Sequence, residues 1–289
     1  MKEPLVYIVI VNYNGYDDTI ECIKSLKDIQ YSNYKIVLVE NASKDKEKIQ
    51  SNSFINENAI VLFSDINGGF SAGNNIGIEY ALNAGADYVL LLNNDTAVDK
   101  DFLNSLVEIG ESDSSIGIVT GDIYYYFDKT KLWYSNGRYD RGSGITQMCV
   151  KTEKMKNNVS FACGCLMLLK RKMLEEIGLL EDLFFLYSED TEYCCRAIDS
   201  GWGIVWTSES KIYHKISVST GENSDFQQYY LTRNNLVLTK MYGKRRLYGY
   251  IKRLWYCLKD ILKGRSNIGP VWFAYVDFVK MKYGKTDRY

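Results

Sequence analysis

Three carboxylates and one imidazole are the side chains of this sequence best placed to do chemistry. Asp95 directly follows an apolar run at residues 88–92, and Glu189 and Asp190 stand where an irregular segment gives way to a helical pattern. His214, the only histidine, follows the last expected strand. A carboxylate and an imidazole at neighbouring strand ends could jointly hold a divalent cation, with ligand oxygens and water completing its shell. A carboxylate at a helix start is easily held against the amides of the first turn.

Each of these residues also has a purely structural explanation. An aspartate after a strand is commonly a turn residue, and one before a helix is commonly an N-cap. A single histidine is often a hydrogen-bonded structural residue. What favours a functional site is their joint placement at the ends of consecutive strands.

The elements that must position these residues follow from the apolar pattern. Continuous apolar runs predict buried strands, and residues 17–29 and 72–84 have helical spacing between them. The alternation predicts right-handed βαβ units and a mainly parallel sheet, whose ligands bind at the carboxyl ends of the strands. We expect strands at residues 5–11, 35–39, 60–63, 88–92, 116–127, 160–169 and 202–207, short helices at 171–177 and 191–200, and a glycine-rich hairpin or loop at 133–144.

Amides, carboxylates and glycines gather after the first four expected strands. They are Asn12, Tyr13 and Asn14, the segment 40–45, the segment 67–70, and Asn93, Asn94 and Asp95. One edge of the sheet therefore carries a polar ligand site. The glycines at 68, 69 and 73 match neither GxGxxG nor GxxxxGK, which argues against a dinucleotide-binding or P-loop site.

Beyond residue 225 the pattern is helical, and residues 245–262 form a broad apolar face flanked by cations. Between residues 240 and 265 there are nine Lys or Arg and one acid, Asp260. A basic helix that carries aromatic residues suits a membrane interface. Equally, it suits a helix packed on the α/β domain with a solvated basic side, and helical periodicity alone does not separate the two.

Composition narrows the class of protein. A chain of 289 residues with 46% hydrophobic residues can bury a large α/β core, and its formal net charge of −1 argues against non-specific nucleic-acid binding. The seven cysteines match no disulfide framework or zinc pattern, so we expect buried thiols. The 24 tyrosines suit amphipathic surfaces that bind rings, sugars or an interface, and composition alone does not separate these. No signal peptide is visible and no run approaches the roughly 20 apolar residues of a spanning helix, so we expect a cytoplasmic protein.

Six motifs in order resemble those of the family 2 glycosyltransferases, especially the rhamnosyltransferase-like branch, over roughly residues 5–240. Residues 9–15 are similar to the family's opening strand and residues 91–95 to its DxD region. The other four resemble its VDNxSxD, NxGFAxGNN, FFxYxEDxDLCxR and YYxxRN elements, and they read VENASKD at 39–45, NGGFSAGNN at 67–75, FFLYSEDTEYCCR at 184–196 and YYLTRNN at 229–235.

The resemblance implies a GT-A fold and a role for each matching residue. Asp95 and His214 would bind Mg²⁺ or Mn²⁺ bridging the donor diphosphate, Asp190 would be the general base with Glu189 beside it, and Arg233 would touch diphosphate or acceptor. The nucleotide-sugar site would comprise Asn12, Tyr13, Asn14, Glu40, Asn41, Asp45, Asn67, Gly73, Asn74, Asn93 and Asn94.

Two positions depart from the family's pattern. Glu40 stands where an aspartate is usual, so contact with the nucleobase would be longer or shifted. The metal motif contains Asn93 and Asn94 before Asp95, so only one full negative charge is available and metal affinity would be modest.

The resemblance implies an inverting hexosyltransferase that moves a sugar, with dTDP-L-rhamnose the first expectation, to a saccharide or lipid-linked saccharide in bacterial cell-surface polysaccharide synthesis. A UDP-hexose transferase, a nucleotidyltransferase and a non-catalytic carbohydrate-binding protein are the alternatives. We expect a catalytic domain at 1–222 and a helical region at 223–289, the latter near the acceptor and contacting a membrane surface through 244–265. Such a protein would be peripheral on the inner face of the cell membrane.

Overall fold

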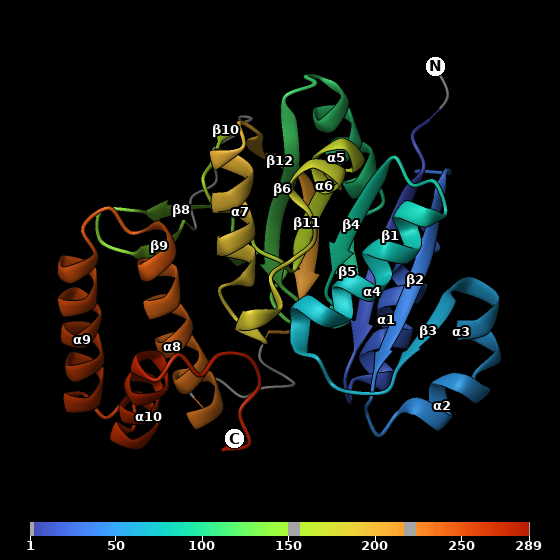
Figure 1. Ribbon diagram of the computed structural model, residues 1–289. Coiled ribbons are helices and arrows are strands. Elements are labelled where there is room, and N and C mark those ends of the chain that lie inside the picture. The colour runs from blue at the N-terminus through green and yellow to red at the C-terminus, as the bar shows by residue number, and fades with distance from the viewer. Residues whose placement is uncertain (1–2, 150–156, 217–223, 289) are drawn as a thin grey trace.

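A mixed β-sheet of ten strands forms the centre of the part of the protein that the structure describes (Figure 1). The structure is a computed structural model, and it describes residues 3–149, 157–216 and 224–288. The sheet order is β10-β12-β6-β11-β4-β1-β2-β3, with β5 and β7 paired at its side.

The first half of the sheet is parallel, as the apolar runs predict. Strands β1, β2 and β4 are mostly buried, whereas the edge strand β3 is half-buried. Each strand is followed by a crossover through a helix, except where β4 leads into the short strand β5. The parallel strands are β1 (Val6–Asn12), β2 (Tyr34–Asn41), β3 (Ile60–Ser64) and β4 (Tyr88–Leu92). Their carboxyl ends meet at one edge, where the polar segments predicted to bind a ligand follow them.

The second half of the sheet is mixed. The strand β11 (Leu166–Lys170) runs antiparallel to both β4 and β6 (Ile116–Tyr125), while β12 (Gly203–His214) runs parallel to β6. The strand predicted at 160–169 begins only at Leu166, because a turn precedes it: the Leu166 amide donates to the Cys163 carbonyl at 3.1 Å.

Smaller strands complete this half. The short β5 (Thr96–Val98) pairs antiparallel with the end of β12, and the expected hairpin near 133–144 is a separate two-stranded sheet of β8 and β9. The remaining bounds are β7 (Leu132–Tyr134), β8 (Asn136–Asp140), β9 (Ile145–Cys149) and β10 (Asn157–Asn158).

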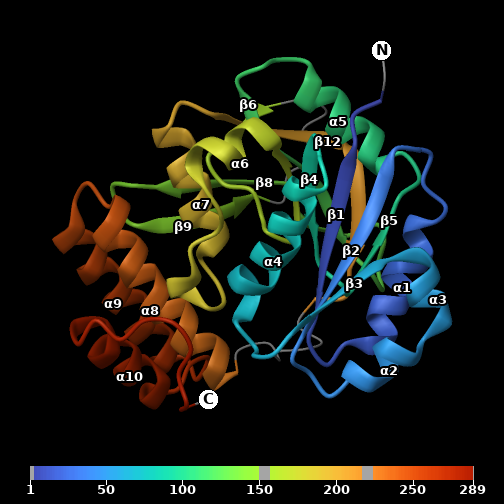
Figure 2. The ribbon, with the colours of Figure 1, turned by 45° about the vertical axis from the view of Figure 1, so that its right-hand side comes forward.

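The side chains of β1 alternate between two hydrophobic cores, one on each face of the sheet. Val6, Ile8 and Ile10 pack into one core, while Tyr7 and Val9 pack into the other. This alternation is the period of two expected of a strand covered on both faces. The first core includes residues of α1 (Tyr16–Leu26), α2 (Lys46–Ser51), α3 (Ser53–Asn58) and α5 (Phe102–Glu111). The second includes residues of α4 (Gly69–Asn83), α6 (Arg171–Ile177) and α7 (Glu189–Asp199) (Figure 2).

Three helices form the C-terminal part of the described chain: α8 (Asp225–Tyr242), α9 (Arg246–Leu262) and α10 (Ile268–Val279). The first two agree with the helical pattern, and α10 lies within the helical region expected at 223–289, although its bounds were not predicted. Helix α8 contacts both of the others and links them to the α/β part (Figure 1). Within the described ranges, no helix combines the length and the apolarity that crossing a membrane requires.

A glycine on α4 sets how closely this helix approaches the sheet. A Cβ at Gly77 would lie 2.3 Å from a Cγ of the buried Val9. We expect Gly77→Ala to lower the free energy of unfolding by about 1–3 kcal/mol, because the overpacked helix must shift. Gly269→Ala on α10 is the control, since a Cβ there meets nothing within 4 Å. Equal urea midpoints for wild type and Gly77→Ala would contradict this packing.

Candidate functional site

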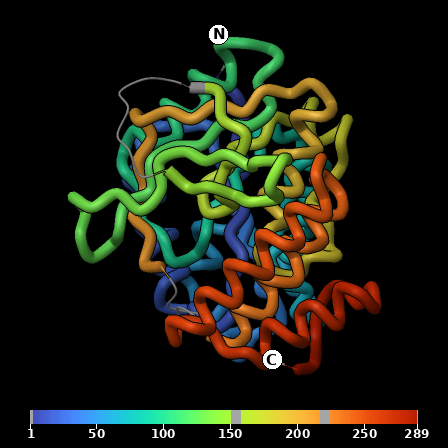
Figure 3. Tube along the Cα trace, turned by 90° about the vertical axis from the view of Figure 1, so that its left-hand side faces the viewer, coloured from blue at the N-terminus to red at the C-terminus, as the bar shows by residue number. Residues whose placement is uncertain are grey.

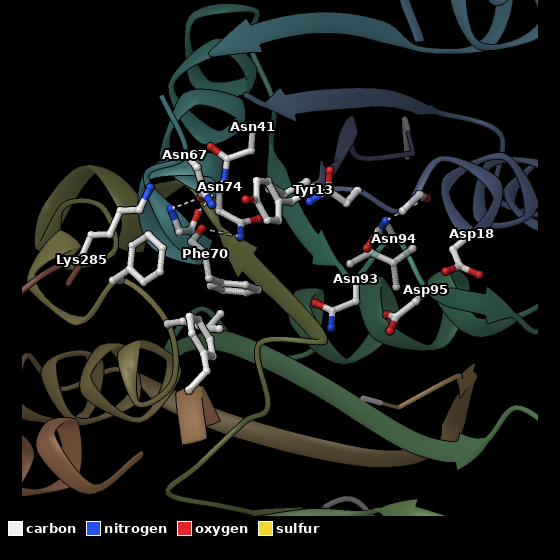
Figure 4. Close-up of a pocket in the computed structure, with 18 residues that line it drawn as sticks. Tyr13, Asp18, Asn41, Asn67, Phe70, Asn74, Asn93, Asn94, Asp95 and Lys285 are labelled. Atoms are coloured by element: carbon white, nitrogen blue, oxygen red, sulfur yellow. Dashed lines mark hydrogen bonds between the residues drawn. The ribbon is translucent and has the colours of Figure 1, made fainter. Parts of the chain in front are cut away.

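A cavity of about 410 Å³ opens at the carboxyl edge of the parallel strands (Figure 4). Its volume falls within the range of about 300–1,000 Å³ usual for small-molecule sites. Half of the residues predicted for the site line it: Tyr13, Asn14, Asn41, Asn67, Asn74, Asn93, Asn94 and Asp95. The sequence therefore predicts the position of this cavity and much of its polar wall.

Asn12 and Glu40 lie behind this wall and face each other. The Asn12 side-chain amide donates to the Glu40 carboxylate at 2.7 Å, and the same carboxylate accepts from the backbone amide and hydroxyl of Ser43. Both side chains are fully buried. They hold the loops after β1 and β2 together, and neither lines the cavity.

Asp45 and Gly73 also lie outside the lining and position what surrounds it. The Asp45 carboxylate accepts from the backbone amide of Tyr16 at 3.1 Å, which joins the start of α1 to the segment after β2. A Cβ at Gly73 would lie 2.8 Å from a Cγ of Val11, so glycine permits α4 to pack closely on β1.

Amide side chains form one wall of the cavity. The Asn41 side chain donates to Asn67 Oδ1 at 3.2 Å and to the Gly69 carbonyl at 3.0 Å, and Asn74 donates to the Phe70 carbonyl at 2.9 Å. These bonds fix the turn between β3 and α4. The wall is consequently rigid, polar and uncharged.

Asp95 and His214 meet at the opposite end of the cavity. The Asp95 carboxylate lies 3.1 Å from His214 Nε2, and Asn93 Nδ2 lies 3.5 Å from the same nitrogen. Both Asp95 and His214 are buried; Asp95 Oδ1, the oxygen that faces Nε2, makes no hydrogen bond, and neither does Nδ1 of His214. The indole of Trp133 packs edge-on against the imidazole of His214, with 5.1 Å between the ring centres.

This pair fits a divalent cation that takes both nitrogen and oxygen ligands. A carboxylate and an imidazole point at one place beside a cavity that admits further oxygen ligands. Within the described ranges, no cluster of three or more His, Cys, Asp and Glu side chains gathers around a possible ion. The remaining ligands would therefore have to come from the substrate and water.

A lysine that the sequence analysis overlooked lies next to this pair. The Lys215 ammonium contacts Asp18 at 2.5 Å and Glu21 at 2.7 Å, and its backbone amide donates to the Asp95 carbonyl at 3.0 Å. Desolvation opposes its charge, but the hydrogen bonds to the two carboxylates prevail and raise its pKa. Asp18 lines the cavity, so this network anchors the metal end to α1. The sequence feature that could have indicated Lys215 is its position directly after His214, the only histidine.

Glu189 and Asp190 begin α7, as predicted. Asp190 accepts backbone hydrogen bonds from Gly164 at 3.1 Å and Thr191 at 2.6 Å, while one oxygen of the buried Glu189 has no partner. Burial raises the pKa of both carboxyls, and the charge of Asp190 raises that of Glu189 further. A carboxylate with a raised pKa is a stronger base, which suits proton abstraction.

Asp190 does not line the cavity but lies near a residue that does. A Cβ at Gly164 would lie 2.9 Å from the Phe70 ring and 3.5 Å from Asp190 Cβ. Phe70 lines the cavity, so Asp190 lies close to a lining residue but does not itself line the cavity.

Arg233 is buried in α8 and does not line the main cavity. Its guanidinium donates to the carbonyls of Gly284 at 2.7 Å and Phe184 at 3.2 Å, and it faces the ring of Tyr230. It borders a second cavity of about 300 Å³. Its contacts are those of a residue that joins the C-terminal segment to the loop before α7.

Asn234 completes this arrangement. Its side-chain amide donates to the carbonyls of Phe184, Leu186 and Tyr187 at 2.8–2.9 Å. The loop it holds follows a short 3₁₀ turn (Asp182–Phe184) and has positive φ at Phe185, Tyr187 and Ser188. Such backbone is unfavourable for residues other than glycine and persists only where its surroundings hold it.

Several lining residues were not predicted to belong to the site. Phe185, Leu186, Phe226 and Lys285 come from the loop before α7 and from the C-terminal part of the chain. Helical or apolar spacing gives no indication that Lys285, near the end of the chain, returns to the cavity. The cavity thus takes residues from both sides of the predicted domain boundary at 222/223.

Comparison with known proteins places this geometry in a family. The family model for glycosyl transferase family 2 matches residues 7–178. The hexosyltransferase Agl10 of low-salt glycan biosynthesis from Haloferax volcanii is 26% identical, covering 97% of this chain and 93% of that relative. The dTDP-rhamnosyl transferase RfbF of Shigella flexneri is 22% identical, covering 81% of this chain and 80% of that relative.

Solved structures share the fold at low identity. GalNAc-T7 with UDP, GalNAc and Mn²⁺ superposes with a TM-score of 0.67 at 16% identity, covering 96% of this chain, which spans 55% of the GalNAc-T7 chain. The mannosyltransferase PcManGT of Pyrobaculum calidifontis, in complex with GDP-Man and Mn²⁺, gives 0.61 at 11% identity, covering 97% of this chain and 81% of that chain. The expected GT-A fold is confirmed. From the order of its motifs, the match over more than half its length and its fold, the chain belongs to glycosyl transferase family 2.

Proposed function

We propose that this protein transfers a sugar from a nucleotide-diphosphate sugar to a hydroxyl of a saccharide acceptor, with inversion at the anomeric carbon. The observation that carries the proposal is one cavity that Asp95 lines at one end, with His214 in contact with Asp95, and that has Asp190 close to its lining residue Phe70. The amide wall between them offers donors and acceptors for ribose and sugar hydroxyls.

Asp95 and His214 would hold Mg²⁺ or Mn²⁺ against the diphosphate. A bound divalent ion supplies Lewis-acid stabilisation of the charge that develops on the departing phosphate. The Mn²⁺ in the two related structures supports this choice of ion. Lys215 would hold Asp18 and Glu21 at this end, so that these carboxylates do not add uncompensated charge beside Asp95.

Asp190 would accept the proton of the acceptor hydroxyl. The acceptor oxygen then forms a bond to the anomeric carbon while the bond from that carbon to the diphosphate oxygen breaks on the opposite face. Inversion follows from this single displacement. The Gly164 and Thr191 amides fix the Asp190 carboxylate, and its burial raises its pKa, which makes it more basic.

The proposed donor is dTDP-L-rhamnose, and a UDP-hexose is the alternative. The name of the Shigella relative favours rhamnose and that of the Haloferax relative a hexose. Cell-surface polysaccharide synthesis in a bacterium is the setting we propose for the reaction. A non-catalytic carbohydrate-binding protein would show no donor hydrolysis, which separates that alternative from an enzyme.

We further propose that the acceptor is lipid-linked and that α9 docks on the membrane that carries it. Only Gly249 and Cys257 of this helix are buried, whereas Trp255 is 55% and Leu258 49% exposed. The exposed apolar residues recur at helical spacing on one face: Leu247, Ile251, Leu254, Trp255, Leu258 and Leu262. Helix α9 is outermost in Figure 1, and Figure 3 faces that side.

The charges beside the apolar face of α9 indicate which kind of surface binds there. The exposed Lys259, Lys263 and Arg265 lie at one end of α9, exposed cations at 244–246 lie at the other, and Asp260 is the single acid. An apolar stripe bordered by cations complements an anionic lipid surface better than a second copy of the same basic face.

For the chemistry, Asp190→Asn should lower turnover by about 10²- to 10⁴-fold while nucleoside diphosphate binding survives, because the amide cannot accept the proton. Since burial raises the pKa of Asp190, wild-type turnover should rise with pH above the ordinary aspartate range of about 3.9. Product formation from labelled donor measures both. Asp199→Asn, an exposed aspartate at the other end of α7, is the control, and unchanged turnover in Asp190→Asn would exclude the assignment.

For the membrane, wild type should sediment with vesicles of phosphatidylcholine and phosphatidylglycerol, and much less with phosphatidylcholine alone. Replacing Lys259 and Lys263 by Gln should weaken binding about tenfold or more, because each cation near an anionic surface contributes about 1 kcal/mol. Replacing Trp255 and Leu258 by Gln should also weaken it, whereas Phe127→Gln, at an exposed site on the turn after β6, should not. Absence of vesicle binding, or a dimer in light scattering that these variants dissolve, would contradict the lipid assignment.

A further inference from the structure

The C-terminal segment after α10 returns to the main cavity and is fixed there. The Gly284 carbonyl accepts from the buried Arg233 at 2.7 Å, and the Thr286 amide donates to the hydroxyl of the buried Tyr230 at 2.9 Å. Lys285 lies between these two anchored residues. Its backbone position is therefore set by the core of α8 and not by chance contact at the surface.

The Lys285 side chain is the one cationic side chain that lines the cavity among the described residues. The charged residues that share the lining are two acids, Asp18 and Asp95. The Lys285 ammonium lies 5.8 Å from the centre of the Phe185 ring. In the part of the chain that the structure describes, no carboxylate lies within ion-pair distance of it.

Lys285 stands at the end of the cavity away from the metal pair. Figure 4 shows Lys285 beside Asn67 and Phe70, with Asp95 and Asp18 at the other end. Phe70 and Asp190 both lie close to Gly164. Lys285 also faces Phe185, in the loop that leads to Asp190. If Asp95 marks the diphosphate and Asp190 the attacking hydroxyl, this contact puts Lys285 on the acceptor's side.

The positive charge continues beyond Lys285 into the second cavity, of about 300 Å³. Lys285 lines both cavities, and Arg233, Lys282 and Arg288 line the second. Its acids are Asp277 and Asp287, and Asp277 is already bonded to the Tyr229 hydroxyl at 2.8 Å and to Arg288 at 3.4 Å. A ligand that extends from the main cavity past Lys285 therefore meets a mainly cationic surface with aromatic rings.

We propose that Lys285 binds an anionic group, a phosphate or a carboxylate, on the saccharide acceptor, and that the second cavity receives the adjoining part of that acceptor. This inference rests on the proposed function, because the acceptor's side is defined by Asp95 and Asp190. The side chain of Lys285 is exposed at the border of both cavities, and its compact ammonium forms no ion pair with a described carboxylate, which favours an anion over a neutral hydroxyl as its partner.

The test separates the donor site from the acceptor site. Calorimetry first measures dTDP and UDP binding with Mn²⁺ for wild type, Lys285→Ala, Lys285→Arg and the control Lys280→Ala, an exposed lysine that lines neither cavity. Ligand-observed NMR then measures glucose, glucose 6-phosphate and glucuronic acid at saturating nucleotide.

We expect wild type and Lys280→Ala to prefer at least one anionic probe over glucose. Lys285→Ala should lose about tenfold of that preference and Lys285→Arg should retain part of it, with nucleotide affinity unchanged. The preferred probe tells phosphate from carboxylate.

Three results would overturn the inference. Wild type could show no preference for the anionic probes, Lys285→Ala could keep the preference, or Lys285→Ala could weaken nucleotide binding as much as probe binding, which would make Lys285 a donor residue. Failure of wild type to bind any nucleoside diphosphate with Mn²⁺ would instead refute the proposed function, so the two failures are distinguishable.

Discussion

The antiparallel pairing of β5 with the end of β12 is the contact on which the site depends. It sets His214 opposite Thr96, and so brings the only histidine of the chain beside Asp95, 119 positions earlier in the sequence. The register of this pairing has to be exact, because a slip of one residue would turn the His214 imidazole to the other face of the sheet. One further hydrogen bond continues this pairing, because the backbone amide of Lys215 donates to the Asp95 carbonyl. The Lys215 ammonium then forms ion pairs with Asp18 and Glu21 of α1.

The other end of the cavity depends on a clamp built by α8. Asn234 and Arg233 together hold the carbonyls of the loop at 184–187, and the strained loop delivers Asp190 to the start of α7. The same arginine anchors the segment that carries Lys285. The C-terminal helices therefore do more than cover the α/β part, because they position one wall of the cavity and the carboxylate behind it.

Much of this arrangement can be predicted from the sequence, and there are physical reasons why the rest cannot. The strands of the parallel half and the polar residues after them follow from apolar runs, since ligand sites in such sheets lie at the carboxyl ends. Sequence could not tell that Asn12 and Glu40 bond to each other instead of lining the cavity, because both types serve equally as ligand contacts or internal bonds. The resemblance implies that Arg233 touches diphosphate or acceptor; its planar guanidinium bridges carbonyls and borders the second cavity, not the main one. Lys285 reaches the cavity only through tertiary packing.

The central claim is that Asp95 and His214 bind a nucleoside diphosphate through a divalent ion. Calorimetric titration of dTDP and UDP into wild type and Asp95→Asn, each with Mn²⁺ and with EDTA, tests it most directly. The account predicts that at least one diphosphate binds wild type with Mn²⁺, and that removing the ion or the carboxylate weakens binding at least about tenfold. Affinity that is unchanged by both removals, or no binding under any condition, would contradict it.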